Sequence, residues 1–321
     1  MVARASLLWR KRTSSRCRED YTDQVQTRDA IERADGWTSK RFRCLREATP
    51  VDLVASTKLC CVTLSDDPRH AMSSHGVNDD DASQPWLELA ADYERARSSE
   101  DSLDRLVEWP AQRDLIGDVM GRAVLDAGCG NGGKLAELVR DGAADCVGVD
   151  ISGNFLCPRP PGLELITGDF SDLDSIPRLA SRTFDRILFL QSIGYAKDPV
   201  RTLRAARAML ADDGFIVVTR THPIRYAVEL AEQNKTSLGE EYFSAEPYSY
   251  RSGWNDQIAL TKRRYTISAL LNLFSSAGLW IETAIEPQLS EDARRQYPHK
   301  QAWMNKHLGI LMFKLRPHPG K

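Results

Sequence analysis

From residue 123 onward, short apolar runs alternate with stretches in which apolar residues recur at helical spacing. Runs of this length between turn signals are typical of buried strands, and their alternation with helices predicts a parallel sheet. The polar residues gather at the ends of the runs, where the chain leaves the sheet. Strands are predicted at 123–127, 145–150, 163–167, 184–190, 214–219, 279–285 and 308–315.

The residues before 123 have helical rather than strand periodicity. Trp86, Leu89, Ala90 and Tyr93 share one face of a helix predicted at 85–97. A second helical region at 103–119 is interrupted at Trp109-Pro110, because proline cannot continue a helix.

Residues 1–71 show no sustained period and are rich in Arg and Ser. We favour the interpretation that they are a disordered extension, upstream of a true start at Met72. A transit peptide is a second interpretation, because residues 1–18 contain several Arg and Ser and no acidic residue. A small partner-binding region is the third.

The run V-L-D-A-G-C-G-N-G-G at 124–133 predicts a strand, a tight glycine turn and the start of a helix. The free N–H groups of that helix point at the turn and form a ligand site. Gly128, Gly130 and Gly133 fit the G-x-G-x-x-G pattern, and Asp150 lies twenty residues past Gly130. A dinucleotide and S-adenosylmethionine are therefore both candidates.

Asp126 favours S-adenosylmethionine over a dinucleotide. It lies two residues before the first glycine of the turn, where a pyrophosphate would meet its carboxylate at a cost of roughly 1 kcal/mol or more. S-adenosylmethionine carries a sulfonium and an ammonium, which an acid attracts. Asp150 serves either ligand, because both present ribose hydroxyls.

This run resembles the first motif of the class I S-adenosylmethionine-dependent methyltransferases, within them the ubiquinone/menaquinone-type small-molecule group. Residues 86–220 follow the pattern of that superfamily well, and residues 265–316 follow it more loosely. The resemblance implies an α/β Rossmann-like methyltransferase fold, a doubly wound and mostly parallel sheet of seven strands whose last strand is inserted antiparallel. It implies a cofactor-binding domain at 123–316 and an N-terminal helical lid region at 72–122.

The resemblance also implies cofactor contacts outside the glycine turn. Asp169 would bind the adenine amino group and Phe170 would lie against the ring, although Asp169 could instead only cap the next helix. Trp86 and Tyr93 are lid candidates, with core packing as the alternative. The predicted cofactor-binding residues are Tyr93, Asp126, Gly128, Gly130, Asn131, Gly132, Asp150, Ile151, Asp169, Phe170, Gln191 and Ser192.

One segment departs from the superfamily pattern. A full helix should follow Asp150, but Pro158, Pro160 and Pro161 forbid more than about a turn or two. We therefore expect a loop to wall the adenine side of the site.

His222 ends the fifth predicted strand at the same edge as Asp126, Asp150 and Gln191. A histidine, with an ordinary pKa near 6.5, can take the proton that methyl transfer to a hydroxyl or ring carbon releases. We predict that His222 is the catalytic base; the alternative is a histidine that only caps the turn before Pro223.

Residues 226–264 form an insertion between strands five and six that is richer in aromatic residues than the chain as a whole. We interpret it as a substrate lid, with a solvent-facing loop or a dimer contact as the alternative. Arg225 could hold an acidic substrate group, and His299 is by resemblance a weaker candidate base. The predicted substrate-binding residues are Trp86, Tyr195, Arg225, Tyr242, Trp254 and His299.

Composition narrows the class of partner. The chain has 321 residues with 42% apolar content, enough for one large domain and an appendage. Residues 72–321 hold 29 Lys and Arg against 35 Asp and Glu, which argues against a nucleic-acid groove. No apolar run approaches membrane-spanning length, and the seven cysteines show no metal-like spacing. We expect reduced thiols, a cytoplasmic location and no metal.

The function predicted from these features is methyl transfer from S-adenosylmethionine to a small, flat or aromatic metabolite, in secondary metabolism. Carbon, oxygen and nitrogen acceptors all remain open. A protein or nucleic-acid methyltransferase and a non-catalytic S-adenosylmethionine-binding protein are the alternatives. No membrane or nucleic-acid partner is expected, and the sequence is compatible with a homo-oligomer.

Overall fold

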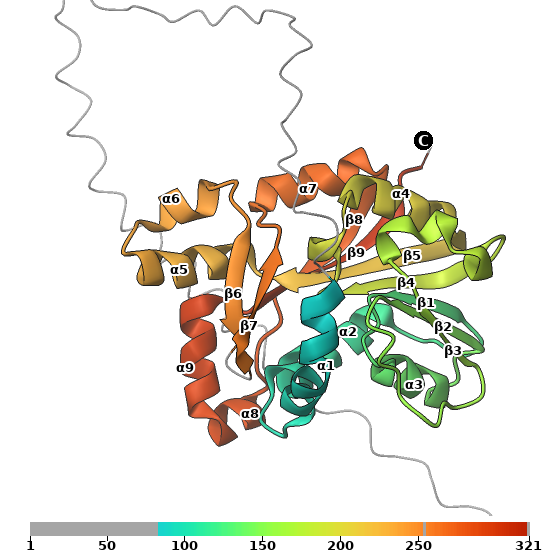
Figure 1. Ribbon diagram of the computed structural model, residues 1–321, viewed down its shortest axis with the longest axis horizontal. Helices are drawn as coiled ribbons and strands as arrows, with labels where there is room; N and C mark the ends of the chain where they lie inside the picture. The colour runs from blue at the N-terminus through green and yellow to red at the C-terminus, as the bar shows by residue number, and fades with distance from the viewer. Residues whose placement is uncertain (1–82, 253–254, 320–321) are drawn as a thin grey trace, which may run out of the picture. The chain divides into compact units, whose positions relative to one another are not determined.

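A seven-stranded sheet forms the centre of the computed structural model, which describes residues 83–252 and 255–319 (Figure 1). The predictions for residues 1–71 and for Trp254 lie outside the described residues. The strand order is β3-β2-β1-β4-β5-β9-β8. The strands are β1 Ala123–Ala127, β2 Asp145–Asp150, β3 Leu163–Thr167, β4 Phe184–Leu190, β5 Leu210–Thr221, β8 Leu279–Ile285 and β9 Ile310–Pro317.

The pairing of these strands confirms the predicted doubly wound sheet. β1 runs parallel to both β2 and β4, and β4 runs parallel to β5. β9 is antiparallel to both of its neighbours, as expected for the last strand of this fold. The carboxyl ends of β1 to β5 therefore meet at one edge of the sheet, where ligands of open α/β sheets bind.

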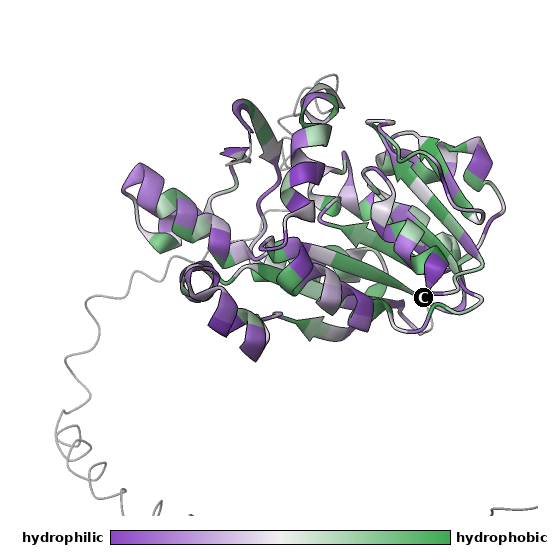
Figure 2. Cartoon of the chain, turned by 90° about the horizontal axis from the view of Figure 1, so that it is seen from below, coloured by the Kyte–Doolittle hydropathy of each residue, from purple (hydrophilic) through white to green (hydrophobic). Residues whose placement is uncertain are grey.

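Successive side chains of a strand point to opposite faces of the sheet, and here both sets are apolar. Helices therefore cover both faces. Ile187 and Phe189 of β4 pack toward one core cluster, and Leu188 between them packs toward the other. In Figure 2 the apolar sheet lies between helices whose outer faces are hydrophilic. Helices α2 (Trp109–Ile116) and α3 (Gly133–Arg140) cover one face, and α4 (Pro199–Ala208) and α7 (Ile267–Ser276) cover the other.

Short sequence motifs explain where helix α4 begins and why a loop follows β2. The Asp198 side chain accepts hydrogen bonds from the N–H groups of Val200 and Arg201 and so caps α4, as the Asp-Pro pair predicts. No helix forms in the segment 151–162 after β2, as its prolines predict. Three short 3-10 turns follow β3 and β4: η2 (Phe170–Ser175), η3 (Pro177–Leu179) and η4 (Ile193–Tyr195).

The insertion after β5 contains more regular structure than the sequence indicates. Two helices, α5 (Pro223–Asn234) and α6 (Leu238–Phe243), precede an antiparallel hairpin of β6 (Tyr248–Ser252) and β7 (Asn255–Lys262). Polar and aromatic residues alternate weakly there, so no hairpin was predicted. Two more helices, α8 (Glu291–Gln296) and α9 (Pro298–His307), lie between β8 and β9.

In the described part of the chain, two N-terminal helices precede α2 and the sheet, and the first of them lies against this hairpin (Figure 1). They are α1 (Ser83–Ser98) and a π turn, η1 (Asp104–Glu108), which runs directly into α2. The amide of Asn255 on β7 donates to Asp92 Oδ2 on α1 at 2.8 Å. Among the described residues, no helix is both long and apolar enough to cross a membrane.

The packing at Gly148 on β2 predicts a measurable loss of stability for Gly148→Ala. An added Cβ would lie 2.6 Å from Cys129 Sγ, 2.7 Å from Leu165 Cδ2 and 2.9 Å from Leu135 Cδ1. Overpacking of this kind costs about 1–3 kcal/mol, measurable as a lower urea midpoint. Gly239→Ala is the matched control, because nothing lies within 4 Å of its added Cβ. Equal midpoints for the two variants would contradict the packing described here.

Candidate functional site

A cavity of about 840 Å³ opens at the carboxyl edge of the sheet. One half of its wall comes from the glycine turn and the ends of β1, β2 and β3. The other half comes from α1, the end of β5, helix α5 and the β6–β7 hairpin. The volume lies within the range of about 300–1,000 Å³ that is usual for small-molecule sites.

The glycine turn brings its backbone unusually close to β4. Gly128 has a φ of +89°, and a Cβ there would lie only 2.4 Å from Ser192 Cβ. The Gly128 N–H donates to Val149 O at 2.8 Å, which fixes the turn against β2. Only glycine fits this conformation and this approach together, so the motif follows from the geometry of the turn.

Asp126 presents an unsatisfied carboxylate oxygen to the cavity. Its residue is 2% exposed, and its Oδ1 has no hydrogen-bond partner in the described part of the chain. Burial raises the pKa of Asp126 to about 7, opposed by Lys134 and Arg97 and assisted by Asp150. A buried carboxylate without a partner is costly unless a cation is supplied, and the ammonium of S-adenosylmethionine would be one.

Asp150 lies beside the turn at the end of β2. Its Oδ2 accepts from Gly130 N–H at 2.8 Å, and its Oδ1 accepts from the backbone N–H and hydroxyl of Ser152 at 2.9 and 2.7 Å. These bonds fix the carboxylate at the cavity wall and leave further lone pairs on both oxygens. That arrangement fits a pair of ribose hydroxyls.

Asp169 caps a turn, which is the alternative role given from the sequence, and it also lines the cavity. Its Oδ1 accepts from Ser171 N–H at 2.8 Å, and Lys197 Nζ lies 3.5 Å from its Oδ2. Phe170 beside it packs edge-on against Phe189, with ring centroids 6.2 Å apart. The adenine contacts of Asp169 and Phe170 stay a prediction.

A charged network beneath the turn was missed by sequence reasoning. Lys134 Nζ donates to Asp104 Oδ1 at 2.8 Å and to Gln112 Oε1 at 2.7 Å. Glu108 accepts from Gln191 Nε2 at 3.2 Å, and burial raises the pKa of Glu108 and lowers that of Lys134. The network joins η1, α2, α3 and the end of β4, which share no local motif, so only the fold reveals it.

The half of the cavity away from the turn is aromatic. Trp86 packs edge-on against both Tyr93 and Tyr195, each with ring centroids 5.5 Å apart. Tyr248 and Tyr250 of the hairpin stack with centroids 5.1 Å apart, and the Tyr250 and Tyr195 hydroxyls are 3.3 Å apart. Such walls suit a flat ligand.

Arg225 also lines this half of the cavity. Its Nε donates to Glu229 Oε1 at 2.8 Å, and the Tyr248 hydroxyl donates to Glu229 Oε2 at 2.8 Å. The predicted residues that line the cavity are Trp86, Tyr93, Asp126, Gly128, Gly130, Asn131, Asp150, Ile151, Asp169, Phe170, Gln191, Ser192, Tyr195 and Arg225.

His222 is not placed as a base, which corrects the prediction. The residue is 1% exposed and does not line the cavity. Its Nδ1 accepts from Ile224 N–H at 3.1 Å, and its Nε2 lies 2.8 Å from Glu286 Oε1. Nδ1 therefore caps α5, which is the role that the sequence left as the alternative, and Nε2 has its partner in Glu286 after β8.

Three further residues lie off the cavity wall. The hydroxyl of Tyr242 accepts from Ile267 N–H at 2.9 Å and so ties α6 to α7. His299 is exposed on α9 and packs edge-on with Tyr297, whereas its neighbour Lys300 lines the cavity. Gly132 caps α3 in the left-handed conformation and shapes the turn without facing the cavity. These positions do not support the predicted ligand contacts of Tyr242, His299 and Gly132, which stay predictions.

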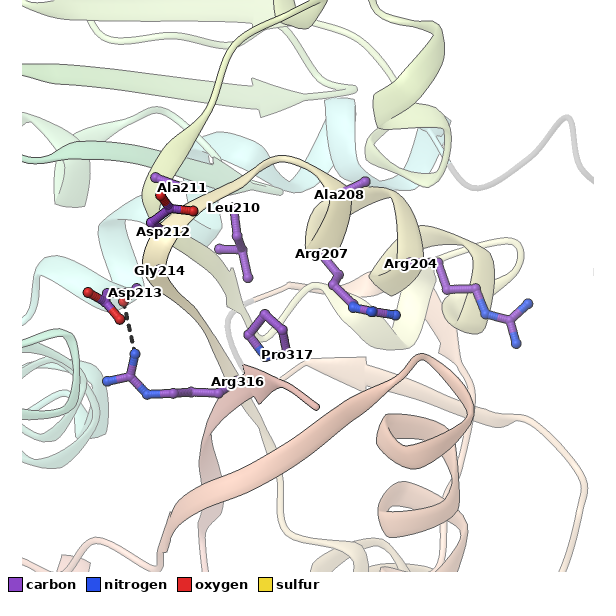
Figure 3. A pocket seen from close by; sticks show the side chains of 10 residues that line it. All are labelled: Arg204, Arg207, Ala208, Leu210, Ala211, Asp212, Asp213, Gly214, Arg316 and Pro317. Atoms are coloured by element: carbon purple, nitrogen blue, oxygen red, sulfur yellow. Dashed lines mark hydrogen bonds between the residues drawn. The ribbon is translucent and has the colours of Figure 1, made fainter. Parts of the chain in front are cut away.

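A second depression, of about 570 Å³, lies at the opposite edge of the sheet (Figure 3). Arg204, Arg207 and Arg316 line it beside the start of β5. Arg204 donates to Ser276 O and Arg316 donates to Asp213 O, so these arginines serve to close loops. The acids of the glycine turn are all at the other edge, which makes the larger cavity the candidate active site.

The parallel sheet with an antiparallel β9, the glycine turn and the acids at three strand ends define a doubly wound cofactor-binding domain. A family model described as methyltransferase domain matches residues 91–283, so the chain belongs to that family. The match supports the predicted S-adenosylmethionine cofactor. The finer ubiquinone/menaquinone-type resemblance stays an expectation.

Individual proteins are similar to this chain in sequence or in fold. An uncharacterized protein of Haemophilus influenzae is 26% identical over 212 residues, which are 62% of this chain and 83% of that one. A tRNA U34 carboxymethyltransferase of Aeromonas salmonicida is 33% identical over 119 residues, 35% of this chain and 36% of that enzyme. A putative S-adenosylmethionine dependent methyltransferase of Listeria monocytogenes shares the fold, with a TM-score of 0.55 and 17% identity over 66% of this chain and 96% of that chain.

The environment of Asp126 predicts a pH-dependent affinity for S-adenosylmethionine. The pKa of about 7 means that the carboxylate forms as the pH rises through neutrality, so calorimetric affinity rises from about pH 6 to 7.5. Asp126→Asn removes a charge-assisted hydrogen bond of about 1.5–3 kcal/mol, a loss of roughly 10- to 100-fold, and flattens the pH dependence. Asp212→Asn, at the far edge of the sheet, serves as the control. Wild-type affinity in Asp126→Asn would refute this role.

The capping role of His222 predicts that His222→Ala lowers stability rather than the rate of methyl transfer. Loss of the cap costs about 1 kcal/mol in chemical denaturation, and His222→Asn recovers most of it because asparagine also caps. A drop in rate of ~100-fold in both variants, with S-adenosylmethionine affinity unchanged, would restore His222 as the base.

Proposed function

We propose that the chain methylates a small, flat metabolite with S-adenosylmethionine as the methyl donor. The observation that carries this proposal is the single cavity, in which an acid-lined half at the glycine turn continues into an aromatic half under α1 and the hairpin. One cavity with two chemically different halves suits a donor and an acceptor held face to face.

Different residues of the site would bind different parts of the donor. S-adenosylmethionine, when bound, supplies a methyl group activated by its sulfonium. Asp126 would hold the ammonium, Asp150 the ribose hydroxyls, and Asp169 with Phe170 the adenine. Helix α1 and the hairpin exclude water over the site, so the chain contributes alignment and desolvation rather than activation of the methyl.

The acceptor half favours a ligand that is flat and carries an acidic group. Tyr195, Tyr248 and Tyr250 provide aromatic walls, and Lys262 brings positive charge to the same space, with its Nζ 4.9 Å from the centroid of the Tyr250 ring. A free-standing cytoplasmic enzyme of secondary metabolism fits this combination, because the aromatic insertion is additional to the sheet. The cover formed by α1 favours a small acceptor over a macromolecule.

A tRNA acceptor is the second candidate. The similarity to a tRNA U34 carboxymethyltransferase favours it, although the chain spans only 36% of that enzyme's length. The excess of acidic over basic residues in 72–321 favours the small molecule, because phosphate binding relies on clustered Lys and Arg.

We expect the full chain to bind S-adenosylmethionine in calorimetry, not to bind NAD, and to transfer labelled methyl to a small aromatic acid. The panel is salicylate, caffeate and anthranilate beside bulk tRNA, with Asp126→Asn as the negative control. Label in a benzoate or cinnamate supports the proposal. Label in tRNA alone supports the second candidate, and a folded chain that does not bind S-adenosylmethionine overturns both.

A further inference from the structure

Tyr226 and Lys262 meet in the acceptor half of the cavity, beyond the end of β5. Tyr226 lies in the first turn of α5, and Lys262 is the last residue of β7. Lys262 Nζ lies 5.2 Å from the centroid of the Tyr226 ring and donates to Thr221 Oγ1 at 3.2 Å. All three side chains line the cavity, so this cluster is open to a ligand.

The strand order places this cluster where an acceptor would lie. Asp169, Asp150 and Asp126 follow β3, β2 and β1 in that spatial order, and β4 and β5 come next. A donor held by the three acids leaves the space over β4 and β5 for the acceptor. Thr221 connects the two regions, because its hydroxyl lies 3.5 Å from Gln191 Oε1 at the end of β4.

The charges around Tyr226 favour its phenolate. Burial would raise the pKa of Tyr226, but the positive charges of Lys262 and Arg220, with hydrogen bonds from Thr221 and Lys262, outweigh burial and lower it. In residues 83–252 and 255–319 no carboxylate pairs with Lys262, so its charge is not cancelled there. By contrast, burial raises the pKa of three tyrosines that also line the cavity, Tyr93, Tyr195 and Tyr248.

The remaining groups around Tyr226 do not supply a free negative charge. Glu229, on the same helix, is bound by both Arg225 and the Tyr248 hydroxyl. Arg220 of β5 donates to Arg263 O at 3.0 Å and lies over the Tyr265 ring, so it stays fixed beside α5. Besides Glu229, the titratable and charged groups that interact with Tyr226 among the described residues are Arg220, Lys262, Arg225, Tyr195, Tyr248 and Tyr265.

We propose that Tyr226 is the general base of the methyl transfer and that Lys262, whose ammonium lies against the Tyr226 ring, is its positioning residue. This inference rests on the proposed function. The acceptor O–H or N–H gives its proton to the phenolate oxygen, the freed electron pair forms the bond to the methyl carbon, and the carbon–sulfur electrons stay on sulfur. The acceptor is therefore a phenol or an amine, whose O–H or N–H still carries its proton near neutral pH, and Tyr226 takes the role that His222 does not fill.

The first test needs no acceptor, and so it can fail independently of the proposed function. Tyrosinate absorbance of the full chain is followed during a pH titration. We expect one tyrosine to ionise before the rest, to be lost in Tyr226→Phe, and to ionise at higher pH in Lys262→Met. Tyr297→Phe is the control, because Tyr297 lies off the cavity wall. A titration curve unchanged in Tyr226→Phe overturns the inference.

The second test follows transfer to salicylate, caffeate or anthranilate, whichever accepts the label. Tyr226→Phe should bind S-adenosylmethionine normally in calorimetry and lose at least ~100-fold in rate. In Lys262→Met the ascending limb of the pH–rate profile should move to higher pH, and Lys262→Arg should return it. A Tyr226→Phe rate within about threefold of wild type, with the donor bound, overturns the base role while leaving the methyltransferase function intact.

Discussion

The parallel pairing of β1 with β2 on one side and β4 on the other is the constraint from which the site follows. It requires every chain reversal after these strands to occur at the same edge. The turn after β1 must then fit between its neighbours, and the 2.4 Å approach to Ser192 leaves space only for Gly128. The backbone that would contact a cofactor is therefore fixed by sheet geometry before any ligand is present.

Negative and positive side chains lie at different strands along this edge of the sheet. Acids stand at the ends of β1, β2 and β3, and Lys262, which pairs with no carboxylate in the described part of the chain, stands beyond β5. Asp126 is buried and the other charges are partly shielded from water, so a ligand of the opposite sign would stabilise each half of the cavity. A cationic donor and an acceptor that becomes anionic during the reaction would satisfy both halves together.

Local signals in the sequence were enough to place the sheet, the glycine turn and most of its acids, because those depend on short-range periodicity and on one contiguous motif. They failed at His222, since its position after β5 was correct but nothing local shows that its ring turns back to Ile224 N–H. Tyr226 and Lys262 could not be paired at all, because their contact depends on a hairpin that the weak alternation of 248–262 conceals. The network around Lys134 could not be predicted either, because its residues are far apart in the sequence and meet only in the fold.

The acceptor half is built mostly by one continuous stretch, from α5 to the end of β7, which enters and leaves the sheet region between β5 and α7. Its stacked tyrosines and Lys262 pack largely on each other, and its bond to α1 passes through Asn255 and Asp92. The residues of this stretch could therefore be replaced without altering the glycine turn and its acids. Replacement or drift within these residues can give the same donor site a new acceptor, so recognition of the metabolite is able to evolve separately from the chemistry of the donor.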